Sequence, residues 1–496
     1  MTTLRLSIPA FPAPRRLALI GAGGGVIVFG LTLPGALPFE ARAALIAVAL
    51  AMLGWIGTRL PESVVALVAV LGLVFAGVLS EEVLFSALGS ELIWLLLSAF
   101  VIGAVLKEAQ LTERLLARVL RRPMRFDLFA LALTVAIAAT AFVLPSTSGR
   151  AALLMPVFLA LAGALPDPRL VKPLALIFPT VILLSAGGSL IGAGAHLLAV
   201  ESIRATTGLG LGYLDWALLG LPFALLSSLA GVLLILWLFV PPALRALPVA
   251  VPAAPAQSPE LSARQRRIAV VLGLLILLWL TTEWHGIGMS LTALIGALVL
   301  LMKPFTPRKT KEVFRAVDVE LLLYMAATVL LAEAMTRSGA DQWLAGAALG
   351  VLPASLAGSL PVVAVLMSLV AVAAHLFITS RSARAAVLIP AVALPLAGLG
   401  HDAALMVLIA VMGTGFCQTM MASAKPVAIF ANADIATFTQ KDLFRLAMPL
   451  MPVVTLLLVI FALALWPAQL RGMRGMSTPL EGGSGSLVIY EARDSR

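Results

Sequence analysis

Two Ser- and Arg-containing motifs lie in the middle of long apolar runs. Residues 146–156 read Ser-Thr-Ser-Gly-Arg-Ala-Ala-Leu-Leu-Met-Pro, and residues 380–390 read Ser-Arg-Ser-Ala-Arg-Ala-Ala-Val-Leu-Ile-Pro. Seven of the eleven aligned positions are identical. Burying a charged side chain inside a membrane costs free energy, so its presence there suggests a functional role. Because Arg binds planar oxyanions through paired N–H donors, the motifs predict a site for a carboxylate or sulfate.

The candidate anion-binding residues come from these two motifs and from one later interruption. They are Ser146, Thr147, Ser148, Arg150, Ser380, Arg381, Ser382, Arg384 and Lys425. Several roles stay open. Arg150 and Arg384 either contact the ligand or cap carbonyls of a neighbouring half-helix, and Arg381 is a ligand contact or a fixed cation. Lys425 belongs to the site or snorkels to the cytoplasmic face. The hydroxyls contact the ligand or bond back to their own helix.

Other titratable groups give a weaker signal. His196 is a candidate proton or substrate contact, although a lone His is more often a satisfied interior group. Neither hairpin motif contains Asp or Glu, so we expect a cationic site without an internal counter-ion. The sequence contains no P-loop and no H-E-x-x-H motif. We therefore expect no enzyme activity, no metal site and no cofactor. Whether sodium is the coupling ion stays open.

The composition defines the elements that must position these residues. Of 496 residues, 61% are hydrophobic and 12% are charged, whereas soluble domains contain about 25% charged residues. This excludes a soluble enzyme and predicts an all-α polytopic membrane protein. The single cysteine, Cys417, excludes internal disulfides. The net charge of +10 is attributed to cytoplasmic loops and not to nucleic-acid binding.

The hydropathy pattern predicts about eleven transmembrane helices and two re-entrant hairpins, since a crossing helix needs about 20 residues. Nine full spans are expected at 17–33, 41–57, 61–79, 91–107, 215–240, 267–283, 286–303, 318–336 and 445–466. Two interrupted spans are expected at 171–200 and 402–432. The runs 128–165 and 359–398 would each be about 60 Å long as one helix, so we interpret them as hairpins with the motifs at their tips.

The two motifs begin 234 residues apart, which indicates an internal repeat. Lys and Arg gather before and between the spans at 5–16, 107–125, 245–267 and 303–315. This places the N-terminus in the cytoplasm if the hairpins enter from opposite sides, so the halves have inverted topology. Inverted repeats with interrupted helices are typical of secondary transporters. The predicted segments are an N-terminal segment with the first helix (1–40), the first repeat (41–240), a cytoplasmic linker (241–265), the second repeat (266–466) and a polar tail (467–496) whose LEGGSGS stretch resembles an artificial linker.

The motifs resemble those of the divalent anion/sodium symporters (DASS), a family within the ion transporter superfamily. In that family each hairpin reads Ser-Asn-Thr, then a small residue, a variable position and Ala, with Leu-x-Pro soon after. The stretch 277–287 also resembles the family's opening of its second half. The resemblance implies a homodimer with a scaffold domain and a transport domain that slides like an elevator. It further implies that a dicarboxylate, citrate or sulfate binds between the hairpin tips, with sodium at oxygen atoms of each tip and broken helix.

This sequence departs from the family pattern at its cation ligands. Residues 192–196 and 422–426 replace the two Gly-Thr-Pro-Pro-Asn motifs, and all four motif asparagines are absent. Thr147 keeps an oxygen, so a cation site stays open at Ser146, Thr147, Gly192, Ala193 and Ser423. At the second tip, Arg381 and Lys425 stand in place of neutral ligands and would repel sodium or replace its charge.

Two alternatives to a divalent-anion transporter remain. One is another member of the superfamily, such as an arsenite or sodium/proton transporter. The other is a non-transporting membrane sensor or a membrane-embedded enzyme. A bacterial inner membrane is expected from the Ala- and Arg-rich composition. The expected partners are a small divalent anion, the lipid bilayer and a second copy of the chain.

Overall fold

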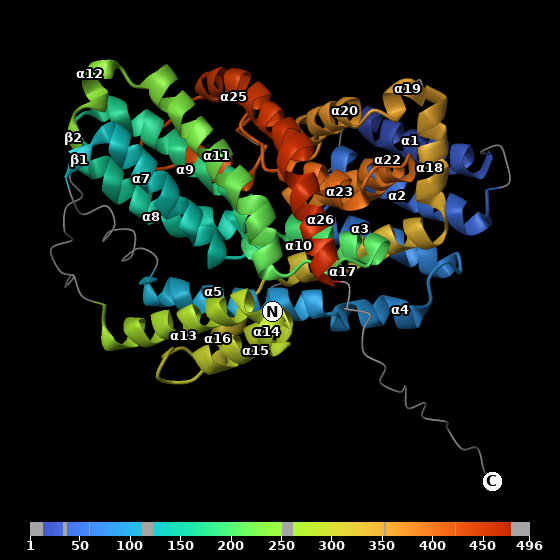
Figure 1. Ribbon diagram of the computed structural model, residues 1–496, viewed down its shortest axis with the longest axis horizontal. Coiled ribbons are helices and arrows are strands. Elements are labelled where there is room, and N and C mark those ends of the chain that lie inside the picture. Colours follow the sequence, from blue (N-terminus) through green and yellow to red (C-terminus); the bar gives the residue numbers. More distant parts are fainter. Residues whose placement is uncertain are drawn as a thin grey trace, which may run out of the picture.

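The structure is a computed structural model that describes residues 13–32, 37–58, 60–111, 123–249, 261–351, 354–421 and 423–477. The linker residues 250–260, the basic stretch 112–122, residue 422 and the end of the predicted tail lie outside this part. The described residues are almost entirely helical (Figure 1). Eight of their helices are long and apolar enough to cross a bilayer, and further apolar helices are shorter. The predicted all-α membrane fold is confirmed.

The helices of the first half follow the predicted spans closely. They are α1 (Ala13–Thr32), α2 (Phe39–Gly57), α3 (Glu62–Phe75), α4 (Glu81–Ser86), α5 (Glu91–Ala109), α7 (Phe126–Ala139), α8 (Thr147–Ala164), α9 (Val171–Ser185), α10 (Gly194–Thr207), α11 (Tyr213–Phe239) and α12 (Pro242–Arg245). A short antiparallel ladder joins β1 (Met124–Arg125) to β2 (Pro248–Val249). The ladder ties the start of the predicted linker to the base of α7, a contact that the sequence analysis did not predict.

The second half repeats much of this order. Its helices are α13 (Ala263–Leu280), α14 (Thr282–His285), α15 (Met289–Leu300), α16 (Thr310–Phe314), α17 (Val319–Arg337), α18 (Ala340–Val351), α19 (Ala354–Ala357), α20 (Leu360–Ala373), α21 (Arg381–Leu388), α22 (Leu394–Gly398), α23 (Ala403–Gly413), α24 (Lys425–Ala431), α25 (Gln440–Ile460) and α26 (Trp466–Ser477). π-Helical turns at Ile389–Ala393 and Phe461–Leu465 join α21 to α22 and α25 to α26. Helices α4 and α18 were not predicted. The first part of the predicted polar tail is helical, because α26 continues α25 to Ser477.

All four predicted interruptions are present as helix breaks. The first apolar run breaks between α7 and α8, just before its Ser-rich motif, and the second breaks between α20 and α21 at the equivalent place. The broken spans are interrupted between α9 and α10 and between α23 and α24. Each break therefore leaves helix ends in the interior of the protein, where their backbone groups need partners.

The broken helices exchange partners between the halves. From the first half, α10 packs against α21 and α23, and from the second half α24 packs against α8 and α9. Helix α11 likewise packs against both α9 and α25. This reciprocal packing is what a pseudo-two-fold relation between two repeats requires. It brings residues more than 200 positions apart to a common centre.

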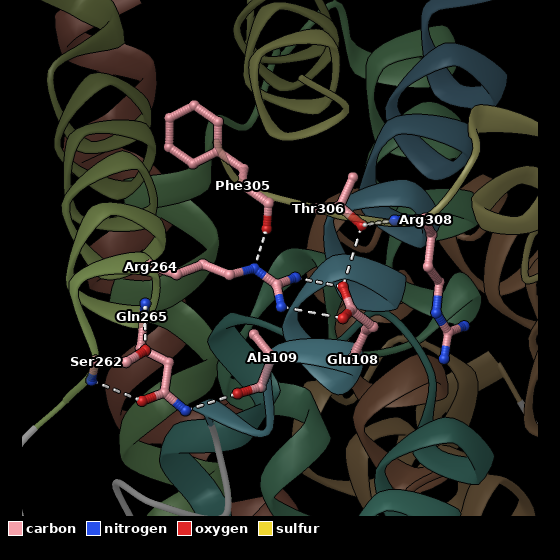
Figure 2. Close-up of polar contacts among 8 residues, drawn as sticks. All are labelled: Glu108, Ala109, Ser262, Arg264, Gln265, Phe305, Thr306 and Arg308. Atoms are coloured by element: carbon pink, nitrogen blue, oxygen red, sulfur yellow. Dashed lines mark hydrogen bonds and ion pairs between the residues drawn. The ribbon is translucent and has the colours of Figure 1, made fainter. Parts of the chain in front are cut away.

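Helices α5 and α13–α16 form a separate layer along the lower side of the molecule in Figure 1, where α5 packs closely on α15. Figure 2 shows the polar joint at one end of this layer, between Glu108 at the end of α5 and Arg264 at the start of α13. The Glu108 carboxylate pairs with two guanidinium nitrogens of Arg264 and accepts a hydrogen bond of 3.1 Å from the Thr306 hydroxyl. Gln265 donates to the Ala109 carbonyl at 2.8 Å. The joint fixes the two halves to each other.

Ion pairs between helix ends agree with the predicted crossing pattern. Lys172 at the start of α9 lies 3.0 Å from Asp442 at the start of α25, and both ends are predicted on the N-terminal side of the membrane. Asp402 and Arg474, at the start of α23 and near the end of α26, lie 2.8 Å apart and are predicted on the opposite side. Treating the second hairpin as a simple span would place Lys172 and Asp442 on opposite faces of the bilayer.

Candidate functional site

Both Ser-rich motifs open on one cavity of about 360 Å³. The hairpin tips provide one part of its lining, and the breaks of the two interrupted spans provide another. The first turns of α3 and α17 complete it. The cavity is lined by nine of the predicted site residues, Ser146, Thr147, Ser148, Ala193, Ser380, Arg381, Ser382, Arg384 and Lys425. The tertiary structure thus gathers the two motifs that the sequence keeps 234 residues apart.

The first serine of each motif begins a helix. Ser146 caps α8 by accepting a hydrogen bond of 3.2 Å from the backbone N–H of Gly149. Ser380 caps α21 in the same way, accepting from Ala383 N–H at 3.3 Å. Both helices begin at the cavity. Their first amides, together with the positive end of each helix dipole, make the region favourable for an anion.

Arg150 lies behind the cavity wall and is completely buried. Its guanidinium donates to the carbonyl oxygens of Ile182 at 3.0 Å and Ile137 at 2.8 Å, and to the hydroxyls of Thr140 at 2.9 Å and Ser185 at 2.9 Å. Ile182 and Ser185 form the C-terminal turn of α9, where a cation is favoured by the helix dipole. Arg150 is thus a tethered cation that joins the first hairpin to the first break, while its direct contact with substrate stays a prediction.

Arg384 makes the equivalent contacts in the second half and is also completely buried. It donates to the carbonyl oxygens of Ile378 at 2.8 Å and Thr379 at 3.4 Å in the second hairpin. It also donates to Thr414 O at 2.8 Å, directly after α23, and lies 2.7 Å from Cys417 Sγ. Unlike Arg150, it reaches the cavity lining. The capping role that the sequence analysis left open is therefore present in the geometry of both arginines.

Arg381 joins the two halves across the site. Its Nη1 donates to Leu183 O of the first break at 3.2 Å, and its Nε donates to the Thr414 hydroxyl of the second break at 3.2 Å. Within the described part of the chain, its Nη2 makes no hydrogen bond, and only 8% of the residue is exposed. Lys425 begins α24, is exposed and lines the same cavity. Arg381 and Lys425 thus place a guanidinium group and an ammonium group in the lining of one cavity.

The residues of the possible cation site are divided between two places. Ala193 lines the cavity beside the first tip, and Gly192 is buried directly behind it. Only glycine fits at 192, since a Cβ there would lie 2.4 Å from the carbonyl oxygen of Ala186. Ser423 belongs to the second break, is buried, and donates its hydroxyl to carbonyls of its own loop, Cys417 O and Met420 O. Cation binding by these residues stays a prediction.

His196 lies away from the cavity and is completely buried. Its Nδ1 is 2.9 Å from Ser189 O, which fixes the ring at the start of α10. The ring centroid lies 5.1 Å from that of Trp216. The Nε2 atom has no hydrogen-bond partner among the described residues. The structure thus places His196 in the support of the first break, and its predicted contact with proton or substrate stays untested.

Three acidic residues line the cavity, contrary to the expected lack of an internal counter-ion. Glu62 is the first residue of α3, and Asp318 and Glu320 stand at the start of α17. The expectation failed because it considered only the hairpin motifs, whereas the opposite wall comes from helices distant in sequence. The signal was present as Pro61-Glu62 at the beginning of an apolar span. It resembles an ordinary acidic first turn of a helix.

Comparison with known proteins decides the family. The pattern of the family described as the sodium:sulfate symporter transmembrane region matches residues 16–471. The chain belongs to this family. The sodium:sulfate symporter family consists of transporters, so the protein is a multi-pass membrane protein and a secondary transporter of anions, and the resemblance recognised in the sequence is confirmed. No curated protein sequence matches the chain.

A solved structure supports the fold. The chain is similar to the YdaH transporter from Alcanivorax borkumensis, whose crystal structure is described as having an unusual topology. The two share 16% identity with a TM-score of 0.55, and the match covers 86% of this chain and 98% of the other. At this identity the likeness concerns the fold alone.

Proposed function

We propose that this member of the sodium:sulfate symporter family carries a small divalent oxyanion, either sulfate, a dicarboxylate or citrate, between its two hairpin tips. The proposal is carried by the single cavity that receives both tips, with Arg381 and Lys425 in its lining. A volume of about 360 Å³ lies at the lower end of the range for small-ligand sites, about 300–1,000 Å³. The N-termini of α8 and α21, each capped by a serine at a hairpin tip, add backbone N–H donors for the anion.

The position of the cavity supports an elevator movement with the binding site facing inward. Part of its lining is formed by the starts of α3 and α17, which follow Arg59 and the basic stretch 303–315 in the chain. By the positive-inside rule these ends lie at the cytoplasmic face, in the inner membrane of a bacterium. Movement of the tips and breaks, as one body, along α17 would carry the site to the other face.

Transport without sodium is the third part of the proposal. The hairpin and break carbonyls of each half, such as Ile182 O and Thr414 O, already accept hydrogen bonds from Arg150 and Arg384. A sodium ion at those oxygens would lie within a few Å of a guanidinium, a repulsion of several kcal/mol even at intermediate dielectric. The two fixed cations therefore supply the charge that a bound ion would otherwise provide.

Uptake into proteoliposomes tests this proposal. Radiolabelled sulfate, succinate and citrate are compared in sodium and in choline buffers. We expect at least one anion to be taken up, at equal initial rates in both buffers. A requirement for sodium with a Hill coefficient above one would contradict the sodium-free mechanism. Failure of the reconstituted protein to move or exchange any of the three anions would contradict the substrate class.

We propose further that two copies form a dimer through the layer of α5 and α13–α16. Leu274 of α13 and Leu291 of α15 are more than half exposed, as are several apolar neighbours on this layer. The decisive measurement is the protein mass in detergent by light scattering, where a dimer has twice the chain mass of 51.7 kDa. A monomeric mass would contradict this assembly.

A further inference from the structure

We propose that Glu62 binds a proton together with the transported anion, so that the protein is a proton-coupled anion transporter. This inference rests on the proposed function, since it concerns the same cavity. It assigns a role to a residue outside both motifs and outside both breaks.

The backbone holds Glu62 at a defined place opposite the hairpin tips. Glu62 follows Pro61 as the first residue of α3, and the Trp55 indole N–H donates to its carbonyl oxygen at 3.2 Å. Helix α3 packs against α2 and along α17, which fixes it in the wall that faces the tips. Its side chain lines the same cavity as Ser380, Lys425 and Arg384.

Ser380 and Lys425 are among the residues that we expect to hold the substrate. An ionised Glu62 is a tethered anion that competes with a free anion for Ser380 and Lys425. Protonation removes its charge and releases both groups. Proton and anion therefore favour each other's binding, and this coupling is reciprocal because both are binding equilibria. With Glu62 ionised, the six charged side chains in the lining sum to zero; with Glu62 protonated, they leave one positive charge for the anion.

The other groups that face Glu62 are less suited to this role. On α17, Asp318 accepts a hydrogen bond of 3.0 Å from Leu321 N–H as the helix cap, and Glu320 lies 3.5 Å from the Ser63 hydroxyl. Tyr324, on the same helix, is completely buried. Arg381 and Arg384 of α21 and Lys425 of α24 are the cations of the cavity lining. His196 and His375 are absent from the cavity lining.

The test measures binding of radiolabelled sulfate to the full-length purified protein between about pH 4 and 8, where sulfate keeps both charges. As Glu62 ionises, we expect the wild-type Kd to rise by up to tenfold per pH unit, the slope for one linked proton. Glu62→Gln should bind sulfate at least as tightly as the acidic wild type, with a flat profile. Glu62→Asp should keep a slope, and Glu91→Gln is the matched control, since Glu91 is the first residue of α5 and lies outside the cavity.

The outcomes separate the two proposals. A steep wild-type profile that Glu62→Gln flattens, and that Glu91→Gln keeps, supports proton coupling at Glu62. The same slope in Glu62→Gln as in the wild type overturns it and leaves the anion site standing. Absence of sulfate binding by the wild type at every pH overturns sulfate as the substrate and this inference with it. In proteoliposomes, an inward proton gradient should accelerate sulfate uptake by the wild type and not by Glu62→Gln.

Discussion

At the scale of single residues, the three hairpin arginines do different work although they share a residue type. Arg150 and Arg384 have both terminal guanidinium nitrogens bonded to carbonyl oxygens, whereas Nη2 of Arg381 has no hydrogen bond among the described residues and the side chain lines the cavity. A ligand gains binding free energy mainly from guanidinium donors that have no protein partner, because a donor already bonded to the protein would have to exchange one hydrogen bond for another. The ligand-binding function of the site therefore depends more on Arg381 than on the two buried arginines.

Replacing Arg381 by Ala should weaken anion binding at least tenfold, or about 1.4 kcal/mol. The variant loses one charge-assisted contact to the ligand and the link between Leu183 O and the Thr414 hydroxyl. Sulfate binding to purified protein is the measurement. Arg169→Ala is the control, since Arg169 is an exposed surface residue paired with Asp167. Unchanged affinity in Arg381→Ala would remove this residue from the site.

At the scale of helices, the two breaks are stabilised by equivalent devices. A serine caps the helix that starts at each tip, and an arginine from that helix caps the helix that ends at the neighbouring break. Each half therefore caps its interior helix ends with a serine and an arginine of its own, and Arg381 adds one bond across the halves, to Leu183 O. Buried backbone groups left without partners would otherwise make the breaks costly.

Arg150→Met and Arg384→Met should both lower the thermal unfolding midpoint of the detergent-purified protein strongly. Each change removes the guanidinium hydrogen bonds to two buried carbonyls, Ile137 O and Ile182 O for Arg150 or Ile378 O and Thr414 O for Arg384. A buried acceptor left unsatisfied costs about 1–3 kcal/mol. Arg169→Met, at a side chain that is 71% exposed, should leave the midpoint unchanged. Wild-type midpoints for both buried variants would show that the arginines do not hold the breaks together.

At the scale of the whole molecule, the cavity lies between two groups of helices that are distant in the sequence. One wall is made of tips and breaks, and the other of the first turns of α3 and α17. The end of α17 that carries Arg337 lies away from this cavity, beside a second one of about 390 Å³ that is lined by α10, α17 and the π-helical turn. Spaces at both ends of α17 fit the proposed sliding movement along that helix.

A single cysteine placed at Thr379 should reveal the direction in which the site opens. Thr379 is exposed and lines the cavity, and Cys417→Ser removes the one native thiol. We expect a membrane-impermeant maleimide to label this variant faster in inside-out vesicles than in intact spheroplasts, and sulfate to slow the labelling. Faster labelling of the spheroplasts would contradict the inward-facing assignment.

The sequence alone was sufficient for features that depend on local composition. The membrane class followed from 61% hydrophobic residues, and the four helix breaks followed from polar motifs inside apolar runs. The repeat was visible because Ser-x-Ser-x-Arg is rare in apolar helices, and the same motifs were enough to recognise the family. The positions of these features are set by the cost of burying polar groups in lipid, which acts on each segment by itself.

The tertiary structure decided which side chains share a cavity. Arg150 and Arg384 belong to equivalent motif positions, yet only the packing of the helices turns the first behind the wall and the second toward the lining. Glu62 and Glu320 were not distinctive in the sequence, because an acidic residue in the first turn of a helix is common. They became part of the site only when α3 and α17 packed together opposite the tips. Such long-range contacts depend on shape and burial across the whole chain, which local patterns do not contain.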